Sequence, residues 1–242
     1  MVTNSNKFRQ AALQFQKYGY YTAAPKNTAQ YKEYWDDEAH RCLYGWTAED
    51  GDSISGYNYW YLNYCPIQVV RKRKIQVGGV EKVIFDRLLD FPVFYDTDYD
   101  YFNYIDEAEN VGKHACVIKR RRAGYSFKAA SMMCRNFYLI PGSKSYAIAA
   151  EAEFLTKDGL LTKAWDLMAW LDRNTAWTKK RQKVDTRMHK RASYIVDNEG
   201  TKIETGFMSE IMGVTLKNDI QKARGKAGKL ILWEEGGKFP AL

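Results

Sequence analysis

Cysteine, histidine and long apolar runs are scarce in this sequence, and each scarcity excludes a class of protein. None of the four cysteines, Cys42, Cys65, Cys116 and Cys134, belongs to a Cys-x-x-Cys pair. Because no secretory signal precedes them, we expect reduced thiols in a cytosolic compartment and no secretion. The three histidines lack the spacing of metal ligands. No apolar run approaches the roughly 18 residues of a membrane-spanning helix, so we expect no contact with a membrane.

Positive charge is abundant by contrast. The chain of 242 residues is long enough for one sizeable core, and its formal net charge is +8. Such a charge suits a polyanionic partner. The basic residues gather at 71–74 (RKRK), 119–122 (KRRR) and 179–191, and the first and third groups either contact DNA phosphates or form solvated faces. The candidate DNA-binding residues are Arg71, Lys72, Arg73, Lys179, Lys180 and Arg181.

Residues 117–131, VIKRRRAGYSFKAAS, have the pattern of a strand, a phosphate-binding loop and a helix. Gly124 and Ser126 match the second glycine and the hydroxyl residue of the common motif G-x-x-x-x-G-K-[ST]. Tyr125 stands where that motif has lysine, and Lys119 stands where it has its first glycine. The cation near the phosphates must therefore come from residues 119–122. A basic strand end in which Gly124 forms an ordinary turn would give the same letters.

A second motif lies about a hundred residues further on. Residues 229–235, KLILWEE, combine a short apolar run with two carboxylates, Glu234 and Glu235. The run is typical of a buried parallel strand, and ligands bind at the carboxyl ends of such strands. The first acid would hold Mg²⁺ through water, and the second would activate the attacking water. A strand that ends in two acids is common, so this motif gains meaning from the loop that precedes it.

Together these motifs resemble the ATPase domain of the large terminase subunit of tailed bacteriophages. One terminase variant of the loop reads K-x-x-R-x-G-Y-S, and Lys119, Arg122, Gly124, Tyr125 and Ser126 follow that spacing. An Arg-Gly pair before the acidic strand, here at 224–225, and an aromatic block upstream of the loop, here at 56–67, also resemble that family. The first acid of the strand is usually Asp in terminases and is Glu here.

The resemblance implies a role for each motif residue. Lys119 would neutralise the phosphates of ATP, and the amides of Ala123, Gly124 and Tyr125 would surround them. Ser126 and Glu234 would hold Mg²⁺, the serine directly and the glutamate through water. The two catalytic residues would be Glu235, which activates water, and Arg122, which reaches the γ-phosphate.

The resemblance also implies a cellular setting. ATP hydrolysis would drive double-stranded DNA into an empty capsid in the cytoplasm of a bacterial host, transiently at the portal. The implied partners are the portal protein, the small terminase subunit and further copies of the chain in a ring, expected to be a pentamer. Terminases continue with a coupling motif and a nuclease domain. The sequence ends at Leu242, so we expect a truncated or partial terminase, to which we assign no nuclease activity.

The expected fold class is α/β. Helix-forming stretches and a Gly78–Gly79 hairpin predict an N-terminal helical and hairpin region over residues 1–112. Strands that alternate with helices predict a P-loop ATPase core over residues 113–242, with three αβα layers and a mainly parallel sheet. Its first strand is expected at 114–118, and a second hairpin around 197–200. The aromatic block either packs the N-terminal region onto this core or stacks on a base.

Two alternatives stay open. The first is a different DNA-dependent P-loop ATPase, such as a helicase. The second is a basic DNA-binding module without enzymatic activity. A DNA-binding module would bind DNA in a salt-sensitive manner without any dependence on ATP. The joint presence of Gly124, Ser126 and the paired acids favours the ATPase.

Overall fold

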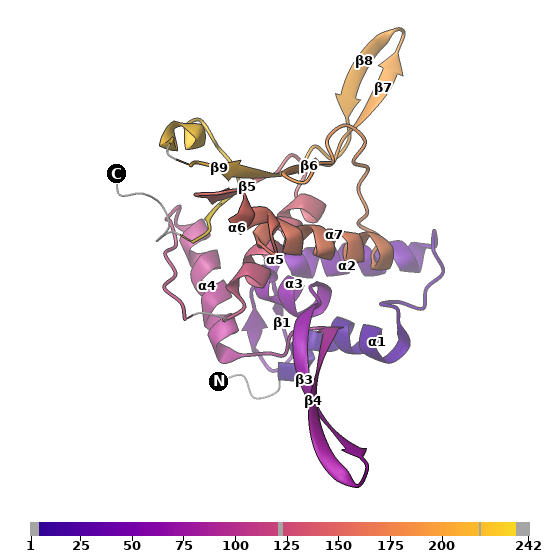
Figure 1. Cartoon of the computed structure of the whole chain (residues 1–242). Helices are drawn as coiled ribbons and strands as arrows, with labels where there is room; N and C mark the ends of the chain where they lie inside the picture. Colours follow the sequence, from indigo (N-terminus) through magenta and orange to yellow (C-terminus); the bar gives the residue numbers. More distant parts are fainter. Residues whose placement is uncertain (1–4, 121–122, 218, 236–242) are drawn as a thin grey trace.

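The computed structural model describes residues 5–120, 123–217 and 219–235 (Figure 1). The first part contains η1 (Ser5–Arg9), α1 (Gln10–Tyr18), α2 (Ala29–Tyr44), β1 (Trp46–Thr47), β2 (Ser53–Ile54), α3 (Gly56–Tyr64), β3 (Ile67–Val77), β4 (Val80–Asp90) and α4 (Asp96–Asn110). The second part contains α5 (Tyr125–Leu139), β5 (Lys144–Ala149), α6 (Glu153–Thr156), α7 (Leu160–Asn174), β6 (His189–Arg191), β7 (Tyr194–Asn198), β8 (Thr201–Thr205), β9 (Glu210–Thr215), η2 (Ile220–Ala223) and β10 (Leu230–Trp233).

Local sequence signals set the ends of the first two long helices. Helix α1 ends at Gly19, which adopts a left-handed φ of 76° and donates its amide to Phe15. Helix α2 begins after Thr28, whose hydroxyl accepts the amide of Tyr31, and it ends at Gly45. Both helices belong to the helical region that was predicted over residues 1–112.

Helix α3 is the centre of the core. All nine of its residues are buried, and five of them are aromatic. The two asparagines are buried as well. The Trp60 ring lies 5.5 Å from the Trp177 ring, and its Nε1–H donates to the Ser131 carbonyl. The aromatic block therefore packs the N-terminal helices onto α5, which confirms the structural interpretation of that block. One apolar cluster includes residues on both sides of residue 112.

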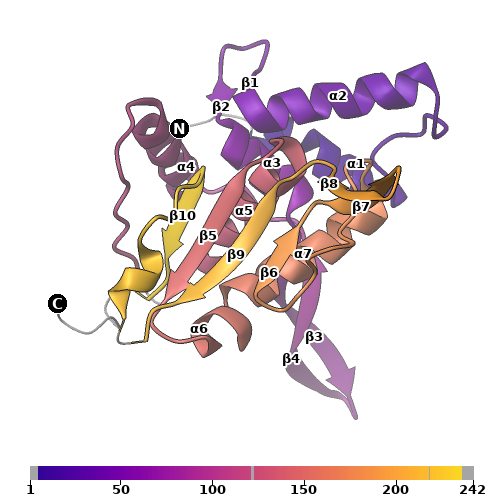
Figure 2. The ribbon, with the colours of Figure 1, turned by 90° about the horizontal axis from the view of Figure 1, so that it is seen from above.

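A four-stranded sheet in the order β10-β5-β9-β6 covers one side of the helices (Figures 1 and 2). Strands β10, β5 and β9 are parallel, and β6 runs antiparallel to β9. Alternation along β5 directs Ala147 and Ala149 toward the helical core, with α5 and α6 against the strand. The predicted α/β class and the mainly parallel sheet are thereby confirmed.

The opposite face of the sheet has a thinner cover. Tyr146, Ile148, Val214 and Leu216 form a separate cluster there, and Ala223 of η2 packs against it. Trp233, at the end of β10, is about half exposed. Among the described residues, η2 is the helical element that reaches this cluster. The sheet therefore has a full helical layer on one face, where the sequence predicted a layer on each.

The strand predicted at residues 114–118 is absent from the described structure. Residues 113–120 form neither helix nor strand, and all of them are exposed. Two hairpins that were predicted do form, β3–β4 and β7–β8, and they project from opposite sides of the body (Figure 1). None of the helices in the described ranges is long and apolar enough to cross a membrane.

Candidate functional site

The candidate site begins where the chain turns into α5. Gly124 has a φ of 74°, a left-handed conformation that favours glycine, and its carbonyl accepts the amides of Phe127 and Lys128. No side chain caps this helix within the described residues. The amides of a helix's first turn have no partner in the helix itself, so such an end attracts anions. The glycine and the helix occupy the places that the loop motif predicts.

The two sequence motifs meet at this helix end. The Ser126 hydroxyl donates a hydrogen bond of 2.9 Å to Oε1 of Glu234, across 108 positions of sequence. Glu234 follows β10 directly, and its amide donates to the Ile148 carbonyl of β5. The parallel pairing of β10 with β5 therefore carries the carboxylate to the first turn of α5. The hydroxyl and the acid that the sequence assigned to one metal ion are in direct contact.

These oxygens fit the chemistry of Mg²⁺. Mg²⁺ takes oxygen ligands, keeps several waters, and is commonly held by one or two protein oxygens together with substrate phosphates. Ser126 and Glu234 offer such a pair, and both side chains are half-buried. No group of three acidic, histidine or cysteine residues within the described ranges forms a complete metal site. The geometry suits an ion that arrives with a nucleotide.

Of the two expected catalytic residues, Glu235 and Arg122, the structure describes Glu235. Glu235 is exposed and has a φ of 54°, a left-handed conformation that is strained for a residue with a side chain. The chain therefore turns at Glu235, directly after Glu234. Arg122 lies outside the described residues.

A groove of about 720 Å³ adjoins this helix end. Lys119, Tyr125 and Glu234 all line it, together with residues of α4 and β10. The exposed Lys119 therefore shares a hollow with the acid and with the start of α5. Ala123 is half-buried directly before Gly124. Of the predicted phosphate-binding residues, Lys119 and Tyr125 line this groove, whereas Ala123, Gly124 and Ser126 are not among its lining residues.

Sequence reasoning missed a buried ion pair beneath the loop. Nζ of Lys128 lies 2.6 Å from Oδ1 of Asp98 in α4, and both side chains are almost fully buried. The same Nζ lies 4.1 Å from the centroid of the Tyr125 ring and 3.5 Å from the Ala123 carbonyl oxygen. Burial is the main cause that raises the pKa of the Tyr125 hydroxyl, and Asp98 adds to it. The available signal was a lysine between Phe127 and the run AASMM, in a helix that is otherwise largely apolar there.

Because Asp98 neutralises Lys128, this lysine is not a free cation for a phosphate. Its position instead ties α4 to the first turn of α5, under Tyr125. Tyr125 also meets Tyr101 of α4, with ring centroids 4.9 Å apart. Tyrosine at the usual lysine position therefore acts as a packing residue, and Lys119 is the cation of the loop motif that is exposed and lines the groove.

The predicted DNA-binding residues divide into two kinds. Arg71, Lys72 and Arg73 are all exposed on the β3–β4 hairpin, where the two arginines pair with Asp90 and Asp86. Residues 179–181 each contact another residue of the chain. Lys179 lies 4.2 Å from the Phe207 ring, and burial lowers its pKa; Lys180 lies over Tyr194, and Arg181 pairs with Asp172.

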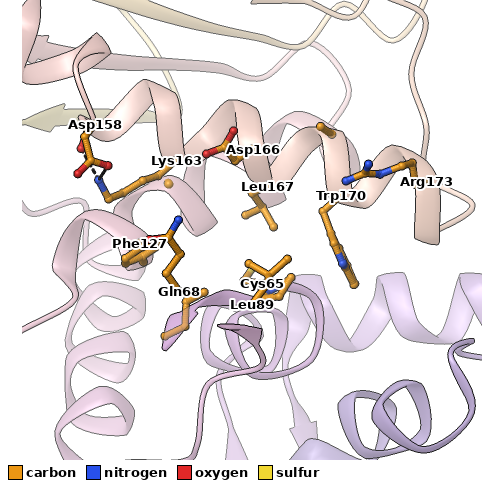
Figure 3. A pocket seen from close by; sticks show the side chains of 14 residues that line it. Cys65, Gln68, Leu89, Phe127, Asp158, Lys163, Asp166, Leu167, Trp170 and Arg173 are labelled. Atoms are coloured by element: carbon orange, nitrogen blue, oxygen red, sulfur yellow. Dashed lines mark hydrogen bonds and ion pairs between the residues drawn. The ribbon is translucent and has the colours of Figure 1, made fainter. Parts of the chain in front are cut away.

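A second cavity, of about 280 Å³, lies between α7 and the base of the β3–β4 hairpin (Figure 3). Leu167 and Trp170 of α7 face Cys65 and Leu89 across it, and Lys163 pairs with Asp158 at one end. None of the residues expected in the nucleotide site lines this cavity. It is therefore a separate feature of the molecule.

Comparisons with known proteins add no relative. No protein-family model, no curated protein and no solved structure matches this chain. The assignment of the site therefore rests on the residues around Ser126 and Glu234 and on their geometry.

Proposed function

We propose that this chain is an ATPase that binds Mg²⁺-ATP at the start of α5, as the motor domain of a terminase large subunit. The observation that carries the proposal is the 2.9 Å contact between Ser126 and Glu234. Two motifs that are individually weak meet at one point, in the sequence order of a phosphate loop and an acidic strand. A basic turn and an unrelated strand end would have no reason to meet there.

The groove residues have distinct roles in this proposal. Lys119 neutralises the β- and γ-phosphates, and the amides of Ala123, Gly124 and Tyr125 bind their oxygens. Ser126 and Glu234 hold the Mg²⁺ ion that accompanies ATP, which would offset charge on the phosphates. Glu235 orients and deprotonates the attacking water. Arg122 is proposed, from the resemblance alone, to reach the γ-phosphate.

The architecture supports a P-loop type of ATPase core. Strand β10 delivers Glu234 from its carboxyl end, where parallel α/β sheets bind ligands. Helix α5 packs against β5 and β9 with its first turn beside that edge. The finer class, a three-layer P-loop core, is proposed from the two motifs, although residues 113–120 form no strand and η2 is the helical element beside Tyr146 and Val214 among the described residues.

The proposed work of the motor is to drive double-stranded DNA into a procapsid. The portal protein, the small terminase subunit and a ring of copies, expected to be a pentamer, are the proposed partners, in the cytoplasm of a bacterial host. These partners follow from the family resemblance. The net charge of +8 supports the DNA partner.

Calorimetry of Mg²⁺-ATP binding tests the proposal. We expect measurable binding by the wild-type chain and at least a tenfold loss in Lys119→Ala, because this exposed lysine lines the groove at the motif's cation position. Lys113→Ala is the matched control, since Lys113 belongs to the same exposed segment and lines the same groove away from the motif. We expect that control to bind within about twofold of wild type.

Two results would contradict the proposal. Wild-type affinity in Lys119→Ala would remove this lysine from the phosphates. A folded wild-type chain that binds DNA but no Mg²⁺-ATP would favour the DNA-binding module. Turnover is a weaker test, because ring ATPases commonly require a neighbouring subunit for catalysis, whereas binding requires one copy.

A further inference from the structure

The β3–β4 hairpin is a long ribbon with two chemically different faces. Each strand has eleven residues, and the ribbon extends away from the body of the molecule (Figure 1). The register pairs Arg71 with Asp86 and Lys72 with Phe85, so alternate pairs lie on opposite faces. We call the face of Arg71 and Asp86 the paired face and the face of Lys72 and Phe85 the open face.

On the paired face, two of the three basic residues form ion pairs with its two acids, and the third, Lys82, is exposed. Arg71 forms an ion pair with Asp90, and Arg73 lies 3.1 Å from Asp86. Ile84 on the same face is partly buried. This face therefore supports the ribbon, which needs such contacts because isolated two-stranded hairpins are marginally stable in water.

The open face has a different composition. Its ten residues are all exposed, and they are Gln68, Val70, Lys72, Lys74, Gln76, Glu81, Val83, Phe85, Arg87 and Leu89. Phe85 is 67% exposed and Val70 is 63% exposed. Lys74 pairs with Glu81 near the tip, whereas Lys72 and Arg87 have no ion-pair partner among the residues that the structure describes. Exposed apolar groups between unpaired cations mark an interaction surface.

We propose that the open face binds double-stranded DNA as a β-ribbon in the major groove. The major groove of B-DNA is wide enough for a two-stranded ribbon. Lys72 and Arg87 lie on opposite strands of the ribbon, two register positions apart, and would each contact a phosphate. Val70 lies directly opposite Arg87, and Phe85 directly opposite Lys72, and both would make apolar contacts with base edges. This inference deepens the proposed function, because it rests on that function's DNA partner and assigns the surface that binds it.

The charge of the ribbon favours DNA over a protein partner. Residues 67–90 contain six basic and three acidic residues. All acids except Glu81 lie on the paired face. The open face therefore presents its free charge with one sign, as a polyanion requires. A protein that fits Phe85 and Val70 would need acidic groups beside its apolar contacts.

Fluorescence anisotropy with a labelled duplex tests the proposal across a range of salt concentrations. We expect Lys72→Gln/Arg87→Gln to weaken binding at least tenfold at low salt and to reduce the slope of log K against log salt by about 1.8, since two phosphate contacts are lost. Arg71→Gln/Arg73→Gln removes the same charge from the paired face and is the matched control. We expect the control to bind within about threefold of wild type, with most of the slope retained.

A third variant and a second measurement separate the outcomes. Phe85→Ser should weaken duplex binding severalfold without a change in salt slope, because it removes no charge. Equal losses in the two double variants would overturn the proposal and indicate binding by net charge alone. Unchanged duplex binding in Lys72→Gln/Arg87→Gln would also overturn it and leave a protein as the partner of this face. Mg²⁺-ATP calorimetry on the same variants tests the nucleotide site separately. The proposed function predicts wild-type ATP affinity in all of these variants, because none of them changes a residue of the nucleotide site.

Discussion

Helix α3 and the segment of residues 113–120 are opposite extremes of this molecule. All nine residues of α3 are buried, and they connect the N-terminal helices with α5. All eight residues of 113–120 are exposed, and they form no regular structure. Both segments adjoin α5, the helix to which the candidate site belongs. Stability is therefore concentrated on one side of α5, and the groups available for a ligand lie at its first turn.

The difference has a physical cause. The α3 side chains find apolar neighbours and internal partners, such as the Ser131 carbonyl for the Trp60 indole. Residues 119–122 are four consecutive cations in the sequence, and the two that the structure describes, Lys119 and Arg120, are exposed. A basic segment placed beside an uncapped helix start keeps its charge for an anion. Mutations on the two sides should accordingly separate stability from binding.

Truncation of Trp60 should have the largest effect on stability. Trp60 is fully buried, with its ring close to Tyr64 and Trp177. We expect Trp60→Ala to lower the free energy of unfolding by about 3–5 kcal/mol, measured by urea denaturation. Tyr44→Ala is the control, because Tyr44 is 75% exposed, and its effect should stay within about 0.5 kcal/mol. A loss below about 1 kcal/mol in Trp60→Ala would contradict the central role of α3.

The buried pair under the loop should come next. We expect Asp98→Ala to cost about 3 kcal/mol, because it leaves the Lys128 ammonium buried without a counter-charge. Lys128→Met/Asp98→Leu should recover most of that loss, since an apolar pair of similar volume removes both charges. Thermal and urea unfolding of the three proteins measures this. Additive losses in the double variant would show that the two residues act independently.

Glu38 should make stability depend on pH. Its carboxylate is buried and accepts hydrogen bonds from Tyr59 and Tyr64, and burial raises its pKa. A carboxyl group with a raised pKa in the folded state binds its proton more tightly there, so its contribution to stability falls as pH rises from about 4.5. We expect the unfolding free energy of Glu38→Gln to lack this decrease with rising pH. Urea denaturation of the variant and of wild type at each pH measures the difference. Glu33→Gln, an exposed change on the same helix, should keep the decrease.

The smallest effect should follow removal of one hydroxyl. Tyr125→Phe keeps the ring that contacts Lys128 and Tyr101. We expect Mg²⁺-ATP affinity within about twofold of wild type and unfolding free energy within about 0.5 kcal/mol. Calorimetry and urea denaturation check the two values. A large loss of affinity would give the hydroxyl itself a role at the phosphates.

The sequence predicted those parts of the fold that depend on local signals. Thr28 and Gly45 delimit α2, the Gly78–Gly79 turn forms the first hairpin, and the apolar run of residues 230–233 forms β10. The strand at 114–118 was predicted from an apolar stretch that is too short to define its partner, and in the described structure it pairs with no other strand. Sequence alone indicates a strand's composition, whereas its pairing depends on distant residues.

The candidate site was predicted in part. The contact between Ser126 and Glu234 agrees with the assignment of both residues to one ion. The pair of Lys128 and Asp98 was missed, because ion pairs between helices 30 positions apart have no local signature. The hairpin also shows what composition omits. The run RKRK at 71–74 appears uniform, but pairing with Asp86 and Asp90 neutralises alternate residues and leaves Lys72 available.

The most direct test of the nucleotide site is a double-mutant cycle on Ser126 and Glu234. We would measure ATP affinity with and without Mg²⁺ in wild type, Ser126→Ala, Glu234→Gln and the double variant. We predict that Mg²⁺ strengthens ATP binding in wild type, that either single change removes this gain, and that the double variant loses no more than either. A Mg²⁺ gain that survives in both single variants would contradict the assignment of these two residues to one metal-nucleotide site.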